Sequence, residues 1–494
     1  MKKESELRVL MVAAEASPLI KIGGLGDVAG VLPKAIKALN PTAIDMRVIL
    51  PYHQGLKQKK LKTKLIGSFK LDSLTEEIPC HLFEVESSQI PVYLISNSCI
   101  DNTPGVYCGN PADDAMKYMS FSLAVLEAAK LLDWQFDVLH ANDWHTAVSV
   151  HLLKARRKTD PFFKGSKGLL TVHNMPYNGW GSQAAMKTLG IKPSKNRKLP
   201  RWARYTPLAM GLAAADKVVA VSKGYAEEIL TEPFGSGLSE FMDTLGEKLT
   251  GIVNGIDTDS YNPATDKKIA ENFSSSDLRG KTACKRALQE LAGFKSDPDV
   301  PIFSIVSRLD NQKGIGLALD SISKMIKRDF QFVLLGTGAK ELEIQAAELA
   351  EEHPEKIACF IRFDDGLARQ LYAGADIFLM PSMYEPCGLS QMISMRYGNL
   401  PLAHAVGGLK DTIKDYLTHP QDATGFLYEE ASEKALRKTM LEALKVFKKK
   451  STWTQLQINA MEENFSWSIS AGEYLATYQS LWKDARFERI YHAN

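Results

Sequence analysis

Short apolar runs alternate along this chain with segments whose apolar residues recur at helical spacing, and no other feature restricts the fold as much. An apolar run of about four to eight residues bounded by a turn predicts a fully buried strand. Val28, Leu32 and Leu39 share one face of the segment after the first run, which predicts an amphipathic helix. The strands predicted in the first half are 7–14, 46–50, 92–95, 138–140, 169–172 and 217–221.

The second half repeats this order of strands and helices. Strands are predicted at 302–306, 332–335, 357–361, 377–380 and 400–403. Alternating strands and helices predict parallel sheets that are covered on both faces. A polar, turn-rich stretch between Gly255 and Phe294 separates the halves. We therefore expect an α/β protein of two doubly wound, Rossmann-like domains facing each other across a cleft, with ligands at the carboxyl ends of the strands.

The charge balance of the chain excludes several classes of partner. The 494 residues include 60 Lys and Arg and 58 Asp and Glu, a net charge of +2. A nearly neutral chain has no overall electrostatic attraction to nucleic acid or to an anionic membrane. The apolar run after the polar N-terminus is too short for a secretory signal, and the six cysteines form no CxxC pair. We expect an intracellular protein, in the cytoplasm or, if its source is a plant or alga, in the plastid stroma.

A glycine-rich loop joins the first predicted strand to the first helix. Its sequence runs from Lys21 through Gly23, Gly24 and Gly26 to Asp27. Glycines allow backbone N–H groups to approach a ligand closely, and a helix N-terminus adds partial positive charge. With the charge of Lys21, the loop could bind a phosphate, although a tight turn capped by Asp27 would have the same sequence.

A dinucleotide site is the rival interpretation of this loop. That site needs GxGxxG and an acidic residue at the end of the second strand. Here Gly24, Gly26 and Gly30 match the pattern only loosely, and the second strand ends in Pro51-Tyr52-His53. The sequence therefore argues against a nicotinamide cofactor.

Polar residues follow two other strands of the first half. Asp143 could accept hydrogen bonds from hydroxyl groups, Trp144 could stack on a sugar, and His173 could hydrogen-bond near a reacting centre. A single His after a strand is more often structural. No His-Glu-x-x-His or similar spacing occurs, so we expect no metal site.

The second half carries a complementary set of charges after its strands. Arg308 and Lys313 lie in one loop before a helix, and two such cations can neutralise a diphosphate. A solvated basic turn would look the same. Glu385 follows the strand 377–380, where a carboxylate is suited to bind the hydroxyls of a ribose or hexose, and the N–H groups of Gly388 and Leu389 would point at a ligand.

The motifs together resemble those of bacterial glycogen synthases and plant starch synthases. In order along the chain they are KIGGLGDVAGVLPKAI, HANDWHTA, TVHNMPYNG, GIVNGIDTDSYNPATD, VSRLDNQKG, PSMYEPCGLSQMISMRYGNLP and GGLKDT. The resemblance runs from about residue 7 to about residue 480. It implies a GT-B fold, with an N-terminal acceptor-side domain at 1–255, a nucleotide-sugar domain at 256–470, and a helix at 471–494 that crosses back to the first domain.

The resemblance also implies an activity. Members of this family are retaining glucosyltransferases that extend the non-reducing end of an α-1,4-glucan from a nucleotide-diphosphate glucose, usually ADP-glucose, with UDP-glucose as the other possibility. No metal is then required, since cations and helix N-termini can stabilise the charge that grows on the leaving diphosphate. No separate nucleophile is evident in the sequence. The oligomeric state stays open.

Site residues carry over position by position from the resemblance. Those matching the donor-contacting loop are Lys21, Gly23, Gly24 and Asp27. Asp143 and His173 match active-site residues of the first domain, and Arg308 and Lys313 match the pair that faces the diphosphate. Glu385 matches the carboxylate near the sugar and ribose. The residues expected around the donor glucose are Cys387, Gly388 and Leu389.

Several positions depart from the family pattern, chiefly by loss of cations. Arg is common in the family at Met383, His404 and Lys117, Thr at Val406, and Arg near Asp243 and Leu245. Two alternatives follow. The chain could be a weakly active glucan-binding or priming homologue, or a GT-B transferase with a small non-glucan acceptor.

Overall fold

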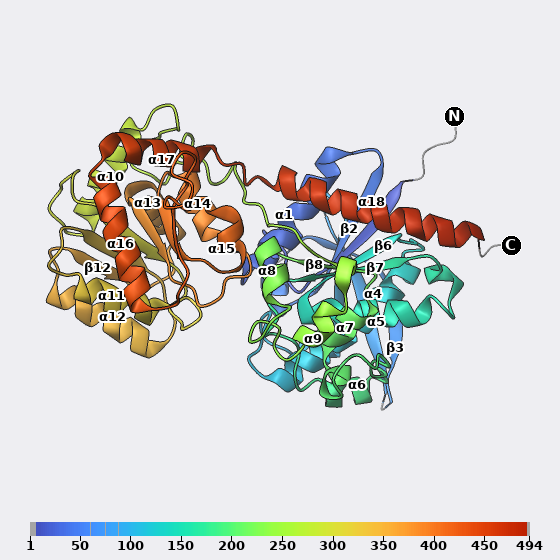
Figure 1. Ribbon diagram of the computed structural model, residues 1–494. Coiled ribbons are helices and arrows are strands. Elements are labelled where there is room, and N and C mark those ends of the chain that lie inside the picture. The colour runs from blue at the N-terminus through green and yellow to red at the C-terminus, as the bar shows by residue number, and fades with distance from the viewer. Residues whose placement is uncertain (1–5, 60, 75, 87, 492–494) are drawn as a thin grey trace. The chain divides into compact units, whose positions relative to one another are not determined.

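The computed structural model describes residues 6–59, 61–74, 76–86 and 88–491. The chain folds into two compact units. Unit 1 comprises Met1–Gly255 and Trp467–Asn494, and unit 2 comprises Ile256–Ser466. Each unit is a sheet covered by helices (Figure 1). Among the described residues, no helix is both long and apolar enough to cross a membrane.

Unit 1 contains a nine-stranded sheet in the order β3-β4-β5-β2-β1-β6-β7-β8-β9. Its strands are β1 (Leu7–Val12), β2 (Ile44–Pro51), β3 (Thr63–Asp72), β4 (Glu77–Val85), β5 (Val92–Asn97), β6 (Val138–Asn142), β7 (Lys167–Val172), β8 (Lys217–Ala220) and β9 (Leu249–Gly251). Its longer helices are α1 (Gly24–Leu39), α4 (Pro111–Leu131), α5 (Asp143–Arg156), α7 (Pro207–Ala214) and α18 (Trp467–Tyr491). The shorter ones are α2 (Gln54–Gln58), α3 (Ser98–Asp101), α6 (Gln183–Thr188), α8 (Lys223–Glu228), α9 (Ser239–Asp243), η1 (Pro161–Phe163), η2 (Trp202–Tyr205) and η3 (Gly246–Lys248).

The expectation of purely parallel sheets is wrong at one edge of unit 1. Strands β3 and β4 form an antiparallel hairpin, and β4 pairs antiparallel with β5. The first six residues of β4 alternate between exposed and buried. Such a half-buried strand has no continuous apolar run, and its sequence therefore did not predict a strand. All strands that were predicted are present, with ends within two residues of the prediction.

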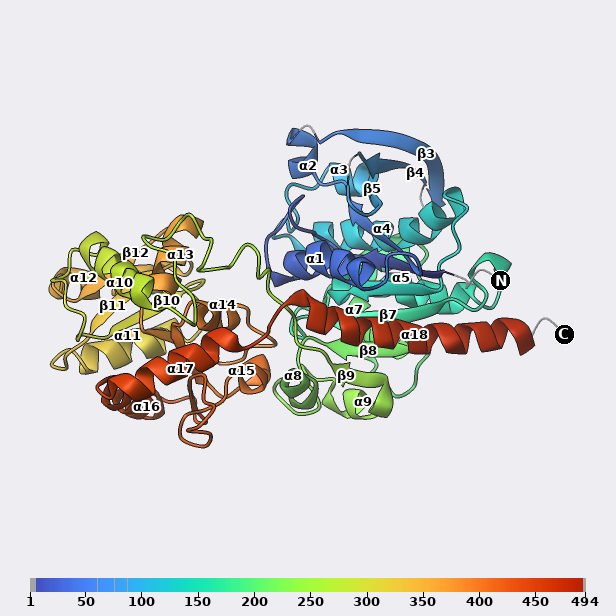
Figure 2. The same cartoon turned by 90° about the horizontal axis from the view of Figure 1, so that it is seen from above.

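The C-terminal helix α18 completes the core of unit 1. It lies beside α1 in both views (Figures 1 and 2). Tyr474 and Tyr478 are buried in the same apolar cluster as β1 and β2. The Tyr478 hydroxyl and Nδ1 of His140 are hydrogen-bonded at 2.7 Å, and the Tyr474 hydroxyl lies 3.4 Å from Oγ1 of Thr171. These bonds join the helix to β6 and β7.

Unit 2 contains a six-stranded parallel sheet in the order β12-β11-β10-β13-β14-β15. Its strands are β10 (Ile302–Val306), β11 (Gln331–Leu335), β12 (Ile357–Phe360), β13 (Ile377–Met380), β14 (Leu400–His404) and β15 (Phe426–Tyr428). Its helices are α10 (Arg279–Leu291), α11 (Ile315–Lys324), α12 (Lys340–Glu352), α13 (Asp365–Gly374), α14 (Ser390–Arg396), α15 (Gly407–Thr412), α16 (Glu433–Phe447) and α17 (Lys450–Glu462).

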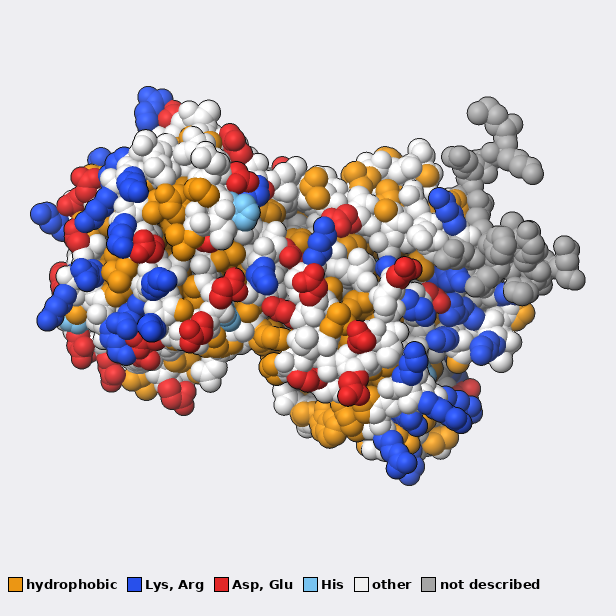
Figure 3. All heavy atoms as spheres, viewed as in Figure 1, with side chains coloured by type: hydrophobic (Ala, Val, Ile, Leu, Met, Phe, Trp, Pro, Cys, Tyr) orange, Lys and Arg blue, Asp and Glu red, His pale blue; other side chains and the backbone are white. Residues whose placement is uncertain are grey.

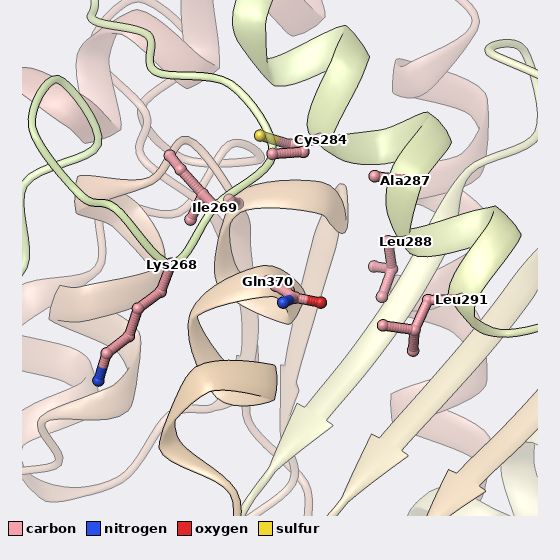
Figure 4. Close-up of a pocket in the computed structure, with 9 residues that line it drawn as sticks. Lys268, Ile269, Cys284, Ala287, Leu288, Leu291 and Gln370 are labelled. Atoms are coloured by element: carbon pink, nitrogen blue, oxygen red, sulfur yellow. The ribbon is translucent and has the colours of Figure 1, made fainter.

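A small hollow of about 230 Å³ lies between α10 and α13 of unit 2. Leu288 and Leu291 reach it from α10, and Gln370 reaches it from α13 (Figure 4). The one charged group at its rim, Lys268, forms an ion pair with Asp365. None of the residues that line this hollow belongs to the site described below.

Candidate active site

The glycine loop after β1 is held in place by a buried carboxylate that was not among the predicted site residues. Glu15 is 1% exposed. It accepts hydrogen bonds from the backbone N–H groups of Ile22 and Gly23 and from the hydroxyl of Tyr107, the latter two at 3.2 Å. Burial raises the pKa of Glu15. A lone acid among alanines, Ala14-Glu15-Ala16, was the only sequence signal for it.

Lys21 stands at this loop with its charge accessible. Its Nζ lies 2.7 Å from a carboxylate oxygen of Asp27 in the first turn of α1, and about half of its side chain is exposed. A Cβ on Gly26 would lie 3.1 Å from atoms of both Glu15 and Lys21. The small residue therefore leaves room for these two side chains to meet the loop.

Asp143 and His173, predicted from separate motifs, lie together in unit 1. Asp143 begins α5 directly after β6, and its Oδ1 accepts the backbone N–H groups of His173 at 2.7 Å and Asn174 at 3.3 Å. Burial raises the pKa of Asp143 to about 7. His173 follows β7, and its Nε2 lies 3.0 Å from Oδ1 of Asn142. Burial lowers the pKa of His173 to about 3, so its ring is neutral at physiological pH.

In unit 2, Lys313 and Glu385 form an ion pair across 72 residues of sequence. The Lys313 Nζ lies 2.5 Å from Oε2 of Glu385, which is 6% exposed. The Ser382 hydroxyl donates to the same oxygen at 3.0 Å. This pair combines a partly exposed cation with a buried carboxylate at the carboxyl ends of β10 and β13.

Two interlocked loops bring this pair together. Gly314 has a φ of +65°, and a Cβ there would lie 2.0 Å from the carbonyl oxygen of Pro381. The N–H of Met383 donates to the carbonyl of Gln312 at 2.8 Å. The loop after β10 is therefore in backbone contact with the loop after β13, and only glycine permits so close an approach.

Arg308 is linked to Lys313 through Asp310, another residue that was not among the predicted site residues. Asp310 Oδ2 lies 2.9 Å from Nη1 of Arg308, and its Oδ1 accepts the backbone N–H of Lys313 at 2.9 Å. The Arg308 side chain is 63% exposed. The guanidinium group is thus oriented but still open to a ligand.

The turn after Glu385 has its own close contacts. Gly388 has a φ of +72°, and the carbonyls of Cys387 and Gly388 accept hydrogen bonds from Nε2 of Gln391 at 3.0 and 3.1 Å. A Cβ on Gly408 would lie 2.3 Å from the Cys387 carbonyl oxygen. Leu389 is the N-cap of α14 and gives it no side-chain cap.

Two of the positions that depart from the family pattern are buried in unit 2, and their side chains pack inside the protein. His404 is buried behind the pair, with Nδ1 2.8 Å from the carbonyl oxygen of Ser382 and its ring stacked on Tyr428. Val406 is also buried, whereas Met383 is partly exposed. Asp243 is the last residue of α9 and is exposed. Leu245 lies two residues beyond the helix and is half-buried.

The geometry defines a class of protein. The chain has two Rossmann-like units. One carries cations beside a buried carboxylate, and the other carries a glycine loop and a polar His-Asp cluster. These are the parts of a GT-B glycosyltransferase. The described residues contain no group of three or more His, Cys, Asp and Glu placed to hold a metal ion. That the reaction requires no metal stays a prediction.

Comparison with known proteins identifies the family. The starch synthase catalytic domain matches residues 8–244, and glycosyl transferases group 1 matches residues 289–456. The glycogen synthase of Clostridium perfringens is 37% identical over 97% of this chain and 99% of its own, and that of Streptococcus mutans is 39% identical over 96% and 100%. The chain therefore belongs to the glycogen synthase family and is a glucosyltransferase, which confirms the resemblance.

Solved structures agree with this assignment. The catalytic domain of starch synthase IV from Arabidopsis thaliana, bound to ADP and acarbose, matches with a TM-score of 0.85 and 28% identity over 97% of this chain and 99% of its own. Sucrose-phosphate synthase from Thermosynechococcus elongatus matches with a TM-score of 0.61 at 16% identity, over 97% of this chain and 100% of its own, which shows the fold alone. The fold class is GT-B, as predicted.

Proposed function

We propose that the enzyme transfers glucose from ADP-glucose to the non-reducing end of an α-1,4-glucan with retention of configuration. The ion pair of Lys313 with the buried Glu385 carries this proposal, together with Arg308, which Asp310 orients beside Lys313. ADP and acarbose in the starch synthase relative support ADP-glucose as donor and an α-glucan as acceptor. We expect the reaction to take place in the cytoplasm, or in the plastid stroma of a plant or alga.

The cations of unit 2 would act on the leaving group. Breaking the anomeric C–O bond leaves positive charge on the glucose ring and negative charge on the diphosphate of ADP. The exposed fork of Arg308 and the ammonium group of Lys313 stabilise that negative charge, and removing one such donor typically costs about 10²–10³ in rate. The second oxygen of Glu385 binds a sugar or ribose hydroxyl. Cys387, Gly388 and Leu389 surround the glucose.

Unit 1 would supply the acceptor side and one donor contact. Lys21 and the loop of Gly23, Gly24 and Asp27 add a further cation and backbone N–H groups for the donor. Because His173 is neutral, it hydrogen-bonds a sugar hydroxyl without repelling the developing positive charge. Asp143 orients the backbone at His173, and the leaving phosphate takes the proton of the acceptor 4-hydroxyl.

Incubation with labelled ADP-glucose or UDP-glucose, with and without glycogen, tests this function. We expect label in polymer from ADP-glucose only when glycogen is present. Efficient transfer from UDP-glucose instead would overturn the donor assignment. Binding to glycogen without turnover of either donor would support the weakly active homologue, and transfer only to a small sugar would support the non-glucan transferase.

A further inference from the structure

Exposed aromatic rings gather on two neighbouring segments of unit 1. Soluble proteins seldom expose contiguous apolar surface unless it binds something. One segment is the loop after β7, and the other is the short helix η2. Their exposed side chains are Tyr177 at 56%, Trp180 at 69%, Trp202 at 37% and Tyr205 at 41%. Hydrophobic side chains are visible on the surface beside α6, which follows Trp180 in the chain (Figure 3).

The two tryptophans at the centre are held in fixed positions. Their ring centroids lie 5.9 Å apart, with 56° between the ring planes. The carbonyl of Asn178 accepts the N–H of Leu208 at 3.1 Å, which ties the loop to the start of α7, and the Asn178 side chain accepts the N–H of Trp180 at 3.0 Å. A Cβ on Gly237 would lie 3.3 Å from the Trp202 ring. Rings held in this way lose little freedom on binding.

The loop that carries Trp180 starts at the polar cluster of unit 1. Asn174 donates its N–H to Asp143 at 3.3 Å, four residues before Asn178. A Cβ on Gly179 would lie 2.7 Å from the Trp144 ring, so the loop packs directly on the residue that follows Asp143. The loop that carries Trp180 is therefore packed against the side of the site that we assign to the acceptor.

We propose that Trp180 and Trp202 form a platform that binds an α-glucan chain outside the Asp143–His173 cluster. This inference rests on the proposed function, because it takes the acceptor of that reaction as its ligand. Aromatic faces stack on the apolar faces of sugar rings, and the indole N–H groups are available to donate to hydroxyls. A neutral polymer requires no charge from the platform, and it is long enough to reach beyond the reacting residue.

The test compares a Trp180→Ala, Trp202→Ala double variant with the parent, using the full chain. Phe363→Ala is the matched control, because Phe363 is 91% exposed in unit 2. Loss of a pair of aromatic anchors is expected to raise KM for glycogen about tenfold more than KM for maltotriose. Mobility in native gels that contain glycogen should increase in the double variant and stay at the parental value in Phe363→Ala. A Trp180→Phe, Trp202→Phe variant keeps the rings and should recover most of the affinity.

Three outcomes would separate the possibilities. If the double variant folds and binds glycogen as tightly as the parent does, the proposed platform is refuted. Loss of self-association in sedimentation with parental glycogen affinity assigns the surface to a second copy of the chain and also overturns it. If the parent transfers no glucose but its retention by glycogen depends on the tryptophans, the platform stands while the proposed reaction fails.

Discussion

Replacing Glu15 tests whether a buried carboxylate organises the glycine loop after β1. In Glu15→Ala the backbone N–H groups of Ile22 and Gly23 and the hydroxyl of Tyr107 lose their acceptor. Ile22 is 65% exposed and its segment lies at the surface, so we count only the lost hydrogen bonds and not the further cost of an unpaired buried donor. Two hydrogen bonds to a charged acceptor are worth about 1.5 kcal/mol each at the low end, or about 3 kcal/mol together.

If that energy holds Lys21 and the loop in their binding conformation, kcat/KM for ADP-glucose at saturating glycogen falls about 100-fold in Glu15→Ala. Glu15→Gln keeps one acceptor oxygen without the charge and is expected to lose about tenfold. Faster hydrogen exchange at the amides of Ile22 and Gly23 in Glu15→Ala would show directly that the loop has lost this conformation.

Glu433→Ala serves as the control for Glu15→Ala. It removes a carboxylate that pairs with Lys324 and Arg437 in unit 2, and should leave kcat/KM within about twofold of the parent, as surface ion pairs contribute little. A folded Glu15→Ala enzyme with kcat/KM within about threefold of the parent would refute the reasoning, since the loop would then hold its conformation without the carboxylate.

Three further predictions concern residues whose contacts are equally specific. Lys313→Met and Glu385→Gln should each lower kcat/KM by about 10² or more, and the double variant should lose no more than the worse single one, because the pair acts as a unit; additive losses would contradict this. The folded pKa of Asp143, about 7, lies above its ordinary 3.8, so its stabilising contribution is complete below pH 3.8 and is lost as pH rises to about 7. Asp143→Asn keeps the acceptor oxygen, and urea unfolding at pH 5 and pH 8 should show it gaining stability relative to the parent at the higher pH. Gly314→Ala should lower the free energy of unfolding by about 2 kcal/mol or more, since its φ of +65° and the 2.0 Å approach to a carbonyl oxygen leave no room for a Cβ, and an unchanged melting temperature would show that the loops can part.

One departure from the family pattern has a structural explanation. Lys117, which stands where Arg is common, is fully buried and donates to the carbonyls of Gly105 at 2.7 Å and Val106 at 3.0 Å. Burial lowers its pKa to about 8. These carbonyls precede Tyr107, the residue whose hydroxyl contacts Glu15. Lys117 therefore stabilises the segment that places Tyr107 against Glu15, and so acts on the glycine loop indirectly. The structure does not explain the changes at Asp243 and Leu245.

Local patterns were enough to predict most of the strands and the residues that follow them. Continuous apolar runs mark strands buried on both faces, and polar side chains just after these runs predicted Asp143, His173, Arg308, Lys313 and Glu385 as candidates. The roles of these residues in the reaction stay predictions. The edge hairpin was missed because neither of its strands contains a continuous apolar run: β4 is buried on one face only, and β3 has a single buried residue.

The sequence by itself determined the alternation of strands and helices, the position of the glycine loop and the family to which the chain belongs. Tertiary structure alone decided which of these groups meet. Lys313 and Glu385 touch because Gly314 lets two backbones approach, Glu15 reaches Ile22 and Gly23 because the chain folds back after β1, and Trp180 lies against Trp202 because Asn178 ties its loop to α7. Contacts between distant residues depend on close packing in three dimensions, which no local pattern records.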